Sequence, residues 1–231
     1  MMKPVCLVTG TGGTLGKALC RELSTEYSII ASYRRAEPPV PSQLQWPVDD
    51  SEQQNESVYC VRADLNRRED VQRLVEVALA RFGHVDAIVN LAADTEFHGK
   101  LLELWHDDEY APMQLQTNCI SPLQLVSAVH QYCWKDQSDQ NALRNRSVVN
   151  ISCMSGLYVF SDTSQAFYGA SKTALNILTM YLSIELAPYS VRANALCPAR
   201  FSSRPPTGRI VGAIKELLEG TATGMVLPMT S

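Results

Sequence analysis

Residues 5–16 read VCLVTGTGGTLG, and this stretch decides the fold. Val5–Thr9 is an apolar run of strand length, Thr9–Gly16 is a glycine-rich turn, and helical periodicity follows from Lys17 to about Glu26. Glycines let a backbone approach a pyrophosphate, and a helix N-terminus favours its negative charge. The order therefore predicts a dinucleotide-binding unit; an ordinary strand-to-helix loop is the alternative. The expected cofactor contacts here are Gly10, Gly13, Thr14, Leu15 and Gly16.

A second strand is predicted at Ser28–Tyr33, and it ends in Arg34 and Arg35. An acidic residue at this point would bind the 2′-hydroxyl of the adenosine ribose, whereas arginine accommodates a 2′-phosphate. The two arginines therefore favour NADP(H) over NAD(H), with two surface arginines as the alternative. Residues 36–57, which are rich in proline and acidic residues, predict a surface loop in place of a full crossover helix.

Strands and helices alternate along the rest of the chain. Further strands are expected at Ser57–Val61, Val85–Leu91, Val148–Ser152, Val191–Cys197 and Met225–Pro228. Helices are expected at Arg68–Phe82, over most of Leu101–Gln131, from about Tyr168 onward, and at Ile210–Glu219. This alternation predicts an α/β fold with a Rossmann-type, doubly wound parallel sheet in a three-layer α/β/α arrangement. Residues 1–231 are expected to form a single dinucleotide-binding catalytic domain, with ligands at the carboxyl ends of the strands.

Tyr168 and Lys172 are four residues apart in a helical pattern and therefore point the same way. A free tyrosine has a pKa of roughly 10, and a nearby cation lowers it, which suits a general acid or base. Ser155, one loop away, is placed to hydrogen-bond the same substrate oxygen. A core aromatic residue beside a solvated lysine is the alternative for this pair.

Composition limits the partners that the chain is expected to have. The net charge of −4 argues against a nucleic acid or an anionic membrane surface. No apolar run approaches the roughly 20 residues that span a bilayer. The seven cysteines are scattered singly, and neither they nor the four histidines have metal-ligand spacing. We therefore expect reduced thiols, a cytoplasmic location, no metal and a small-molecule substrate.

These motifs together resemble the short-chain dehydrogenase/reductase family over nearly the whole chain. The matching positions, in the family's order, are Thr9–Gly16, Asp64, Asn90–Ala93, Asn118, Ser155, Tyr168, Lys172 and Pro198. Ser155 also precedes Tyr168 by the family's usual spacing. One departure is that the glycines fit TGxxGxxG, which is typical of the longer, extended members.

The resemblance implies a role for each matching residue. Tyr168 would exchange a proton with the substrate oxygen, Lys172 would assist it and bind the nicotinamide ribose, and Ser155 would position the carbonyl. Asn118 would hold a water linked to Lys172. The remaining cofactor contacts would be Asp64 near the adenine, Leu65, Asn90 and Ala92 elsewhere on the cofactor, and Pro198 near the nicotinamide. Relatives also pair their long helices, here those around Leu125 and Leu175, into homodimers or homotetramers.

The function expected from this resemblance is NADPH-dependent reduction of a carbonyl compound, with Tyr168 as general acid. The alternatives are an NAD-dependent alcohol dehydrogenase and a non-catalytic, NADP-binding regulatory protein. Between Pro198 and Ile210 the chain is shorter than is usual in the family, and Arg204-Pro-Pro206 stiffens it. This predicts an open substrate cleft.

Overall fold

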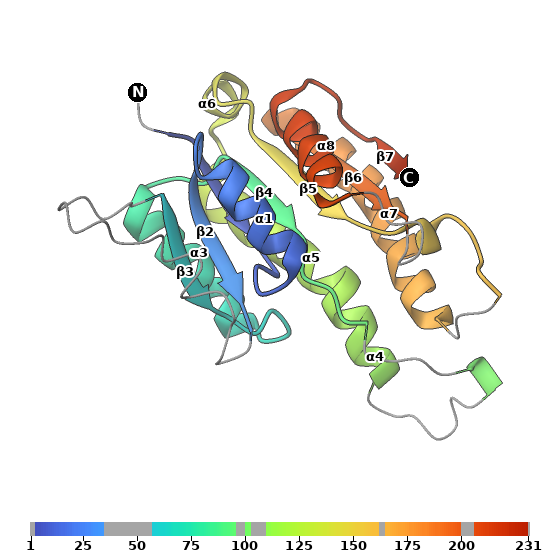
Figure 1. Ribbon diagram of the computed structural model, residues 1–231. Helices are drawn as coiled ribbons and strands as arrows, with labels where there is room; N and C mark the ends of the chain where they lie inside the picture. The colour runs from blue at the N-terminus through green and yellow to red at the C-terminus, as the bar shows by residue number, and fades with distance from the viewer. Residues whose placement is uncertain are drawn as a thin grey trace.

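The computed structural model describes residues 3–34, 57–95, 100–102, 110–161, 165–199 and 206–230 (Figure 1). A seven-stranded sheet runs through them in the order β3-β2-β1-β4-β5-β6-β7, and every neighbouring pair is parallel. The strands are β1 (Val5–Val8), β2 (Ser28–Tyr33), β3 (Val58–Arg62), β4 (Ala87–Asn90), β5 (Ser147–Ile151), β6 (Arg192–Pro198) and β7 (Val226–Met229). The predicted doubly wound sheet is confirmed, and its strand order reverses between β1 and β4.

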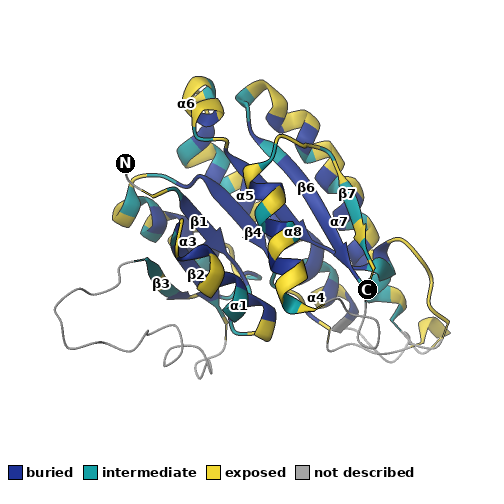
Figure 2. Ribbon diagram, turned by 45° about the horizontal axis from the view of Figure 1, so that its top comes forward, coloured by how far each residue is buried: buried dark blue, intermediate teal, exposed yellow. Residues whose placement is uncertain are grey.

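Helices connect the strands and cover both faces of the sheet (Figures 1 and 2). They are α1 (Thr14–Leu23), α3 (Arg68–Phe82), α4 (Tyr110–Leu115), α5 (Ser121–Val129), α6 (Ser138–Leu143), α7 (Ala166–Leu186) and α8 (Thr207–Glu219). Single turns of other helix types are η2 (Gln116–Ile120) and η3 (His130–Trp134), which are π-helical, and η4 (Met154–Gly156) and η5 (Ala187–Tyr189), which are 3₁₀. None of the helices in the described ranges is both long and apolar enough to cross a membrane.

The core has two apolar layers, one on each face of the sheet. Helices α1 and α8 pack on one face through residues such as Leu19 and Ile214. Helices α3, α5 and α7 pack on the other through residues such as Leu74, Leu125 and Leu186. Because both faces are covered, β1, β4 and β5 are buried along their whole length, which explains why they read as continuous apolar runs and not as alternating patterns.

Helix boundaries are where the structure departs most from the sequence prediction. Helix α1 begins at Thr14, not Lys17, because the carbonyl of Gly13 already accepts a hydrogen bond from the Lys17 amide. The helix expected over Leu101–Gln131 is, from residue 110 on, divided into α4 and α5 by the π-helical turn η2. The polar stretch Lys135–Arg146 contains the short helix α6, which was not predicted. Residues 35–56, which include most of the proline-rich acidic segment, lie outside the described ranges.

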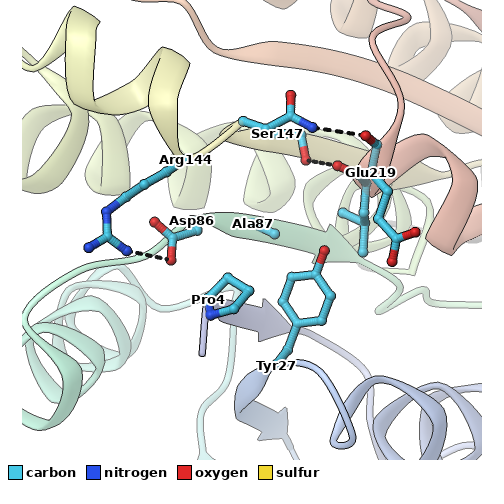
Figure 3. A pocket seen from close by; sticks show the side chains of 9 residues that line it. Pro4, Tyr27, Asp86, Ala87, Arg144, Ser147 and Glu219 are labelled. Carbon is cyan, nitrogen blue, oxygen red and sulfur yellow. Dashed lines mark hydrogen bonds and ion pairs between the residues drawn. The ribbon is translucent and has the colours of Figure 1, made fainter. Parts of the chain in front are cut away.

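A buried ionic cluster closes the amino-terminal edge of the sheet. The Asp86 carboxylate, 2% exposed, accepts a hydrogen bond from the Val5 amide at 2.9 Å. Arg144 and Arg146 each approach one of its oxygens at 3.4 Å. The Arg144–Asp86 pair lies in the wall of a cavity, which Tyr27 and Glu219 also line (Figure 3). The cavity has a volume of about 190 Å³. Since its walls come from the amino ends of the strands, this cavity is remote from the carboxyl edge where a ligand is expected.

Asp86→Ala is expected to lower the free energy of unfolding by about 3 kcal/mol, because it leaves buried arginine charge without its partner. Urea unfolding followed by circular dichroism measures the change. Asp139→Ala, which removes an exposed carboxylate from the first turn of α6, serves as the control and should cost less than about 1 kcal/mol. Equal losses in the two variants would contradict a structural role for the Asp86 cluster.

Candidate active site

The carboxyl edge of the sheet brings together the glycine turn after β1, the loops after β4 and β5, the end of β6 and the first turns of α7. The predicted residues on this edge are Gly10, Gly13, Asn90, Ala92, Asn118, Ser155, Tyr168, Lys172 and Pro198. Pro198 is the last residue of β6. Arg34 follows β2 and Asp64 follows β3, further along the same edge.

The glycine turn is packed tightly on its protein side. Gly10 has φ +71°, and a Cβ on it would lie 2.6 Å from the backbone of Ala92. Gly16, inside α1, would place a Cβ 2.6 Å from the Gly10 carbonyl oxygen. On its other side the turn is open, because a Cβ on Gly12 meets no atom within 4 Å. A turn that is packed against the protein on one side and open on the other can hold the phosphates of a dinucleotide.

Two threonines tie this turn to its neighbouring strands. The Thr9 hydroxyl oxygen accepts hydrogen bonds from the Leu91 and Ala92 amides, both at 3.1 Å. The Thr11 hydroxyl donates to the Ser32 carbonyl at 3.0 Å, near the end of β2. These contacts hold the β4 loop and the end of β2 against the turn. Gly10 and Ala92, which were both predicted to contact the cofactor, are therefore neighbours in space.

The ends of β2 and β3 form the corner where the adenosine ribose is expected. Arg62 ends β3 beside Tyr33, and its Nε donates to the Arg34 carbonyl at 3.2 Å. A second guanidinium thus reaches the end of β2, although the sequence analysis did not select Arg62. Strand order and register bring Arg62 to the end of β2. Neither can be predicted from the sequence of a single segment. Arg35 lies outside the described residues.

Two of the predicted cofactor residues turn their side chains inward. Leu65 packs into the apolar layer under α3, and Leu15 packs into the layer on the opposite face. Only their backbones are available to a ligand. Asp64 is half-buried, and its carboxylate accepts a hydrogen bond from the Asn66 amide at 3.1 Å. Asn90 is 2% exposed and donates its amide to Asn150 Oδ1 at 2.8 Å, which joins β4 to β5 in the interior.

Tyr168 and Lys172 lie one turn apart in α7, as the spacing predicts. Lys172 Nζ is 5.8 Å from the centre of the Tyr168 ring and donates to the Ile151 carbonyl at 2.9 Å. The lysine is 1% exposed, and burial lowers its pKa to about 8. Because that value is above neutrality, the side chain remains largely protonated at pH 7.

The loop that carries Ser155 packs closely against α7. A Cβ on Gly156 would be 2.8 Å from the Lys172 carbonyl carbon, and one on Gly169 would be 3.0 Å from the Ser155 carbonyl oxygen. Gly169 directly follows Tyr168, so Ser155 is held beside the same turn of α7. The structure thus brings Ser155, Tyr168 and Lys172 together from two segments.

Asn118 lies in η2, where the π-helical turn divides α4 from α5. Its Oδ1 accepts from the Asp94 amide at 2.6 Å, and its Nδ2 donates to the Asp94 carbonyl at 2.8 Å and to Ser171 Oγ at 3.2 Å. Ser171 in turn donates to the Tyr168 carbonyl at 2.7 Å. Asn118 therefore links the loop after β4 to the first turns of α7. Its expected role of holding a water near Lys172 stays a prediction.

Residues 4–206 match the family model described as short chain dehydrogenase. The chain belongs to this family. Family membership assigns it to the oxidoreductases, in a family that uses nicotinamide cofactors.

Similar proteins include YtkK of Bacillus subtilis, whose name assigns it to the oxidoreductases. It is 28% identical over 215 residues, which are 93% of this chain and 76% of YtkK. The solved structure of the NADH-dependent reductase A1-R′ with NAD has a TM-score of 0.85 and 19% identity, covering 99% of this chain and 95% of that one. A tyrosine-to-phenylalanine variant of ElxO with NADPH bound has a TM-score of 0.81 and 21% identity, covering 98% of this chain and 97% of that one. These two structures match this chain in fold.

The open substrate cleft predicted between Pro198 and Ile210 stays a prediction, because residues 200–205 lie outside the described ranges.

Gly16→Ala is expected to lower the free energy of unfolding by about 1–3 kcal/mol, because the new methyl group meets rigid backbone. Gly212→Ala in α8 is the matched control. Its methyl group meets no atom within 4 Å, so the better helix propensity of alanine should raise stability by about 0.5–1 kcal/mol. Chemical denaturation measures both variants. A Gly16→Ala protein as stable as Gly212→Ala would contradict the close approach.

Proposed function

We propose that the chain is an NADPH-dependent carbonyl reductase that converts a ketone or an aldehyde into an alcohol. The observation that supports this most is the buried Lys172 ammonium one helical turn from Tyr168, beside the Ser155 loop at the carboxyl edge of the sheet. Such an arrangement suits proton transfer to an oxygen atom on which negative charge develops.

NADPH, when bound, supplies the hydride for the substrate carbon. The residues of the chain act on the substrate oxygen. The Tyr168 hydroxyl donates its proton to that oxygen, and the Lys172 ammonium stabilises the phenolate that remains. The Ile151 carbonyl holds Lys172 in place at 2.9 Å. The Ser155 hydroxyl donates a hydrogen bond to the same oxygen, which polarises the carbonyl before the proton moves.

Preference for NADPH is supported by the two guanidinium groups at the end of β2. Arg34 follows the strand, and the Arg62 Nε donates to its carbonyl. Arginine suits a 2′-phosphate because its planar group forms two parallel hydrogen bonds to phosphate oxygens. We extend this role to Arg35 by its position in the sequence. An NAD-dependent alcohol dehydrogenase is the second candidate, since A1-R′, a structure with this fold, is described with NAD.

A non-catalytic, NADP-binding regulatory protein is a third candidate, and the environment of Lys172 argues against it. Burying an ammonium ion is costly, and here one carbonyl oxygen accepts from it among the described residues. A protein that only bound the cofactor would have no use for the Tyr168 acid that this ammonium assists. A reductase uses it in every turnover.

We also propose a homodimer or homotetramer in the cytoplasm, with a small carbonyl or alcohol compound as substrate and no nucleic-acid or membrane partner. Leu125 and Leu175, near which helix pairing was expected, are buried in the core and leave no side chain for a partner. The outward apolar residues of α7 are Ile177, Met180, Tyr181 and Ile184. The proposed subunit contact therefore uses these residues. The proposed cytoplasmic location is supported by the cysteines. All seven are free thiols, which suits a reducing compartment.

Tyr168→Phe is expected to lower NADPH-dependent reduction by about 10²- to 10⁴-fold, because the general acid is lost. The measurement is the loss of NADPH absorbance with a panel of aliphatic ketones, aromatic aldehydes and quinones. NADPH affinity, measured by fluorescence titration, should be unchanged. Tyr132→Phe, which removes the hydroxyl of an exposed tyrosine, is the control. Full turnover by Tyr168→Phe would refute the proposed mechanism.

Arg34→Ala and Arg62→Ala are each expected to weaken 2′,5′-ADP binding by about 10-fold, because each removes a charged hydrogen bond to the 2′-phosphate. Binding of 5′-AMP, which lacks that phosphate, should not change. Isothermal titration calorimetry measures both ligands, and Arg21→Ala in the last turn of α1 is the control. If the two nucleotides lose affinity equally, the arginines do not select the phosphate.

A further inference from the structure

Cys153 forms two hydrogen bonds with Ser155, one as acceptor and one as donor. The proposed mechanism assigns no role to either of them. Cys153 follows β5 in an extended conformation, φ −158° and ψ 154°, and caps the single turn η4. Its Sγ accepts a hydrogen bond from the Ser155 amide at 3.4 Å. The same thiol donates to Ser155 Oγ at 3.6 Å. Cys153 is 6% exposed, so water does not compete freely for the thiol.

The loop around this contact is held rigidly, so the thiol and the hydroxyl keep their relative positions. The Gly156 carbonyl accepts from Thr173 Oγ1 at 3.0 Å and from Asn176 Nδ2 at 3.3 Å, both on α7. On the other side of Cys153, the Ser152 hydroxyl donates to the Lys172 carbonyl at 3.2 Å. The loop is thus fixed to the helix on both sides of the Cys153–Ser155 pair.

The direction of these hydrogen bonds decides what Ser155 can do. A serine hydroxyl has one hydrogen to donate and two lone pairs that accept. The Cys153 S–H occupies a lone pair of Ser155 Oγ, which leaves the Ser155 hydrogen for another acceptor. In the part of the chain that the structure describes, no protein acceptor takes that hydrogen. The substrate oxygen is the acceptor that the proposed function supplies.

We propose that Cys153 is a positioning residue, whose thiol turns the Ser155 hydroxyl so that its hydrogen points to the substrate oxygen. This inference rests on the proposed function and adds a residue to it. The thiol acts through Ser155 and does not itself touch the substrate. Both of its hydrogen bonds are weak because sulfur is a poor donor and acceptor, so the expected effect is moderate.

A double-mutant cycle tests the proposal. Cys153→Ala should lower kcat by about 3- to 10-fold, which corresponds to the loss of one modest hydrogen bond, with NADPH affinity unchanged. Cys153→Ser should restore at least the wild-type kcat, because a hydroxyl both donates and accepts. In a Ser155→Ala protein, the further change of Cys153 to alanine should alter kcat by less than about 2-fold. Kinetics use the panel compound that the wild-type protein reduces fastest.

A matched control separates positioning from packing. Cys60→Ala makes the same chemical change in β3, away from the carboxyl edge loops, and should leave kcat unchanged. An equal loss of kcat in Cys60→Ala would overturn the proposal, as would an undiminished effect of Cys153→Ala in the Ser155→Ala background. Unchanged kcat in Cys153→Ala, together with inactive Tyr168→Phe, would overturn this inference alone. Full activity of Tyr168→Phe would instead overturn the proposed function.

Crystal structures of the wild-type and Cys153→Ala proteins give a readout that needs no turnover. The Ser155 side chain should adopt one rotamer in the wild-type protein and several rotamers, or a different one, in the variant. The same single rotamer in both crystals would overturn the proposal even if kcat had fallen.

Discussion

The candidate site depends on one constraint, which is that Lys172 remains charged although it is buried. An ammonium ion in the interior is destabilising unless it is hydrogen-bonded, and here it donates to the Ile151 carbonyl. That carbonyl is available because β5 ends at Ile151. The position of Lys172 therefore couples the end of one strand to the second turn of α7, and Tyr168 is carried to the same place by the helical repeat.

Close contacts also join separate segments at the point where the strand order reverses. Between β1 and β4 the Gly10 backbone and the Ala92 backbone approach so closely that no side chain fits between them. Thr9 closes that contact with two hydrogen bonds from the β4 loop. The glycine turn, the β4 loop and η2 are thus one connected unit, since Asn118 joins the β4 loop to α7. Under the proposed function, this unit would hold a nucleotide lying on the turn in register with Tyr168.

Periodicity and local chemistry were sufficient to predict most of this arrangement. The bounds of β2 and α3 agree with the prediction at both ends, because polar or glycine residues flank each apolar pattern. The proximity of Ser155, Tyr168 and Lys172 could be predicted because two of them share a helix face and the third lies in the preceding loop. The approach of Arg62 to the end of β2 could not be predicted, because its contact with the Arg34 carbonyl is set by strand register. The π-helical turns and α6 have no sequence signal strong enough to compete with ordinary helix and loop patterns.

The groups around Lys172 suit the role that we propose for its charge beside Tyr168. The titratable neighbours that influence its pKa are the thiols of Cys153, Cys197 and Cys119. Burial raises the pKa of the Cys197 thiol to about 11 and also raises the pKa of Cys119, so these two groups are neutral at pH 7. A carboxylate in their place would pair with the ammonium permanently and raise its pKa. Among the described residues, the neutral Cys197 and Cys119 thiols offer no such partner. Under the proposed function, the ammonium gains a partner when Tyr168 gives up its proton. Its attraction is then greatest for the phenolate, the species that proton transfer creates.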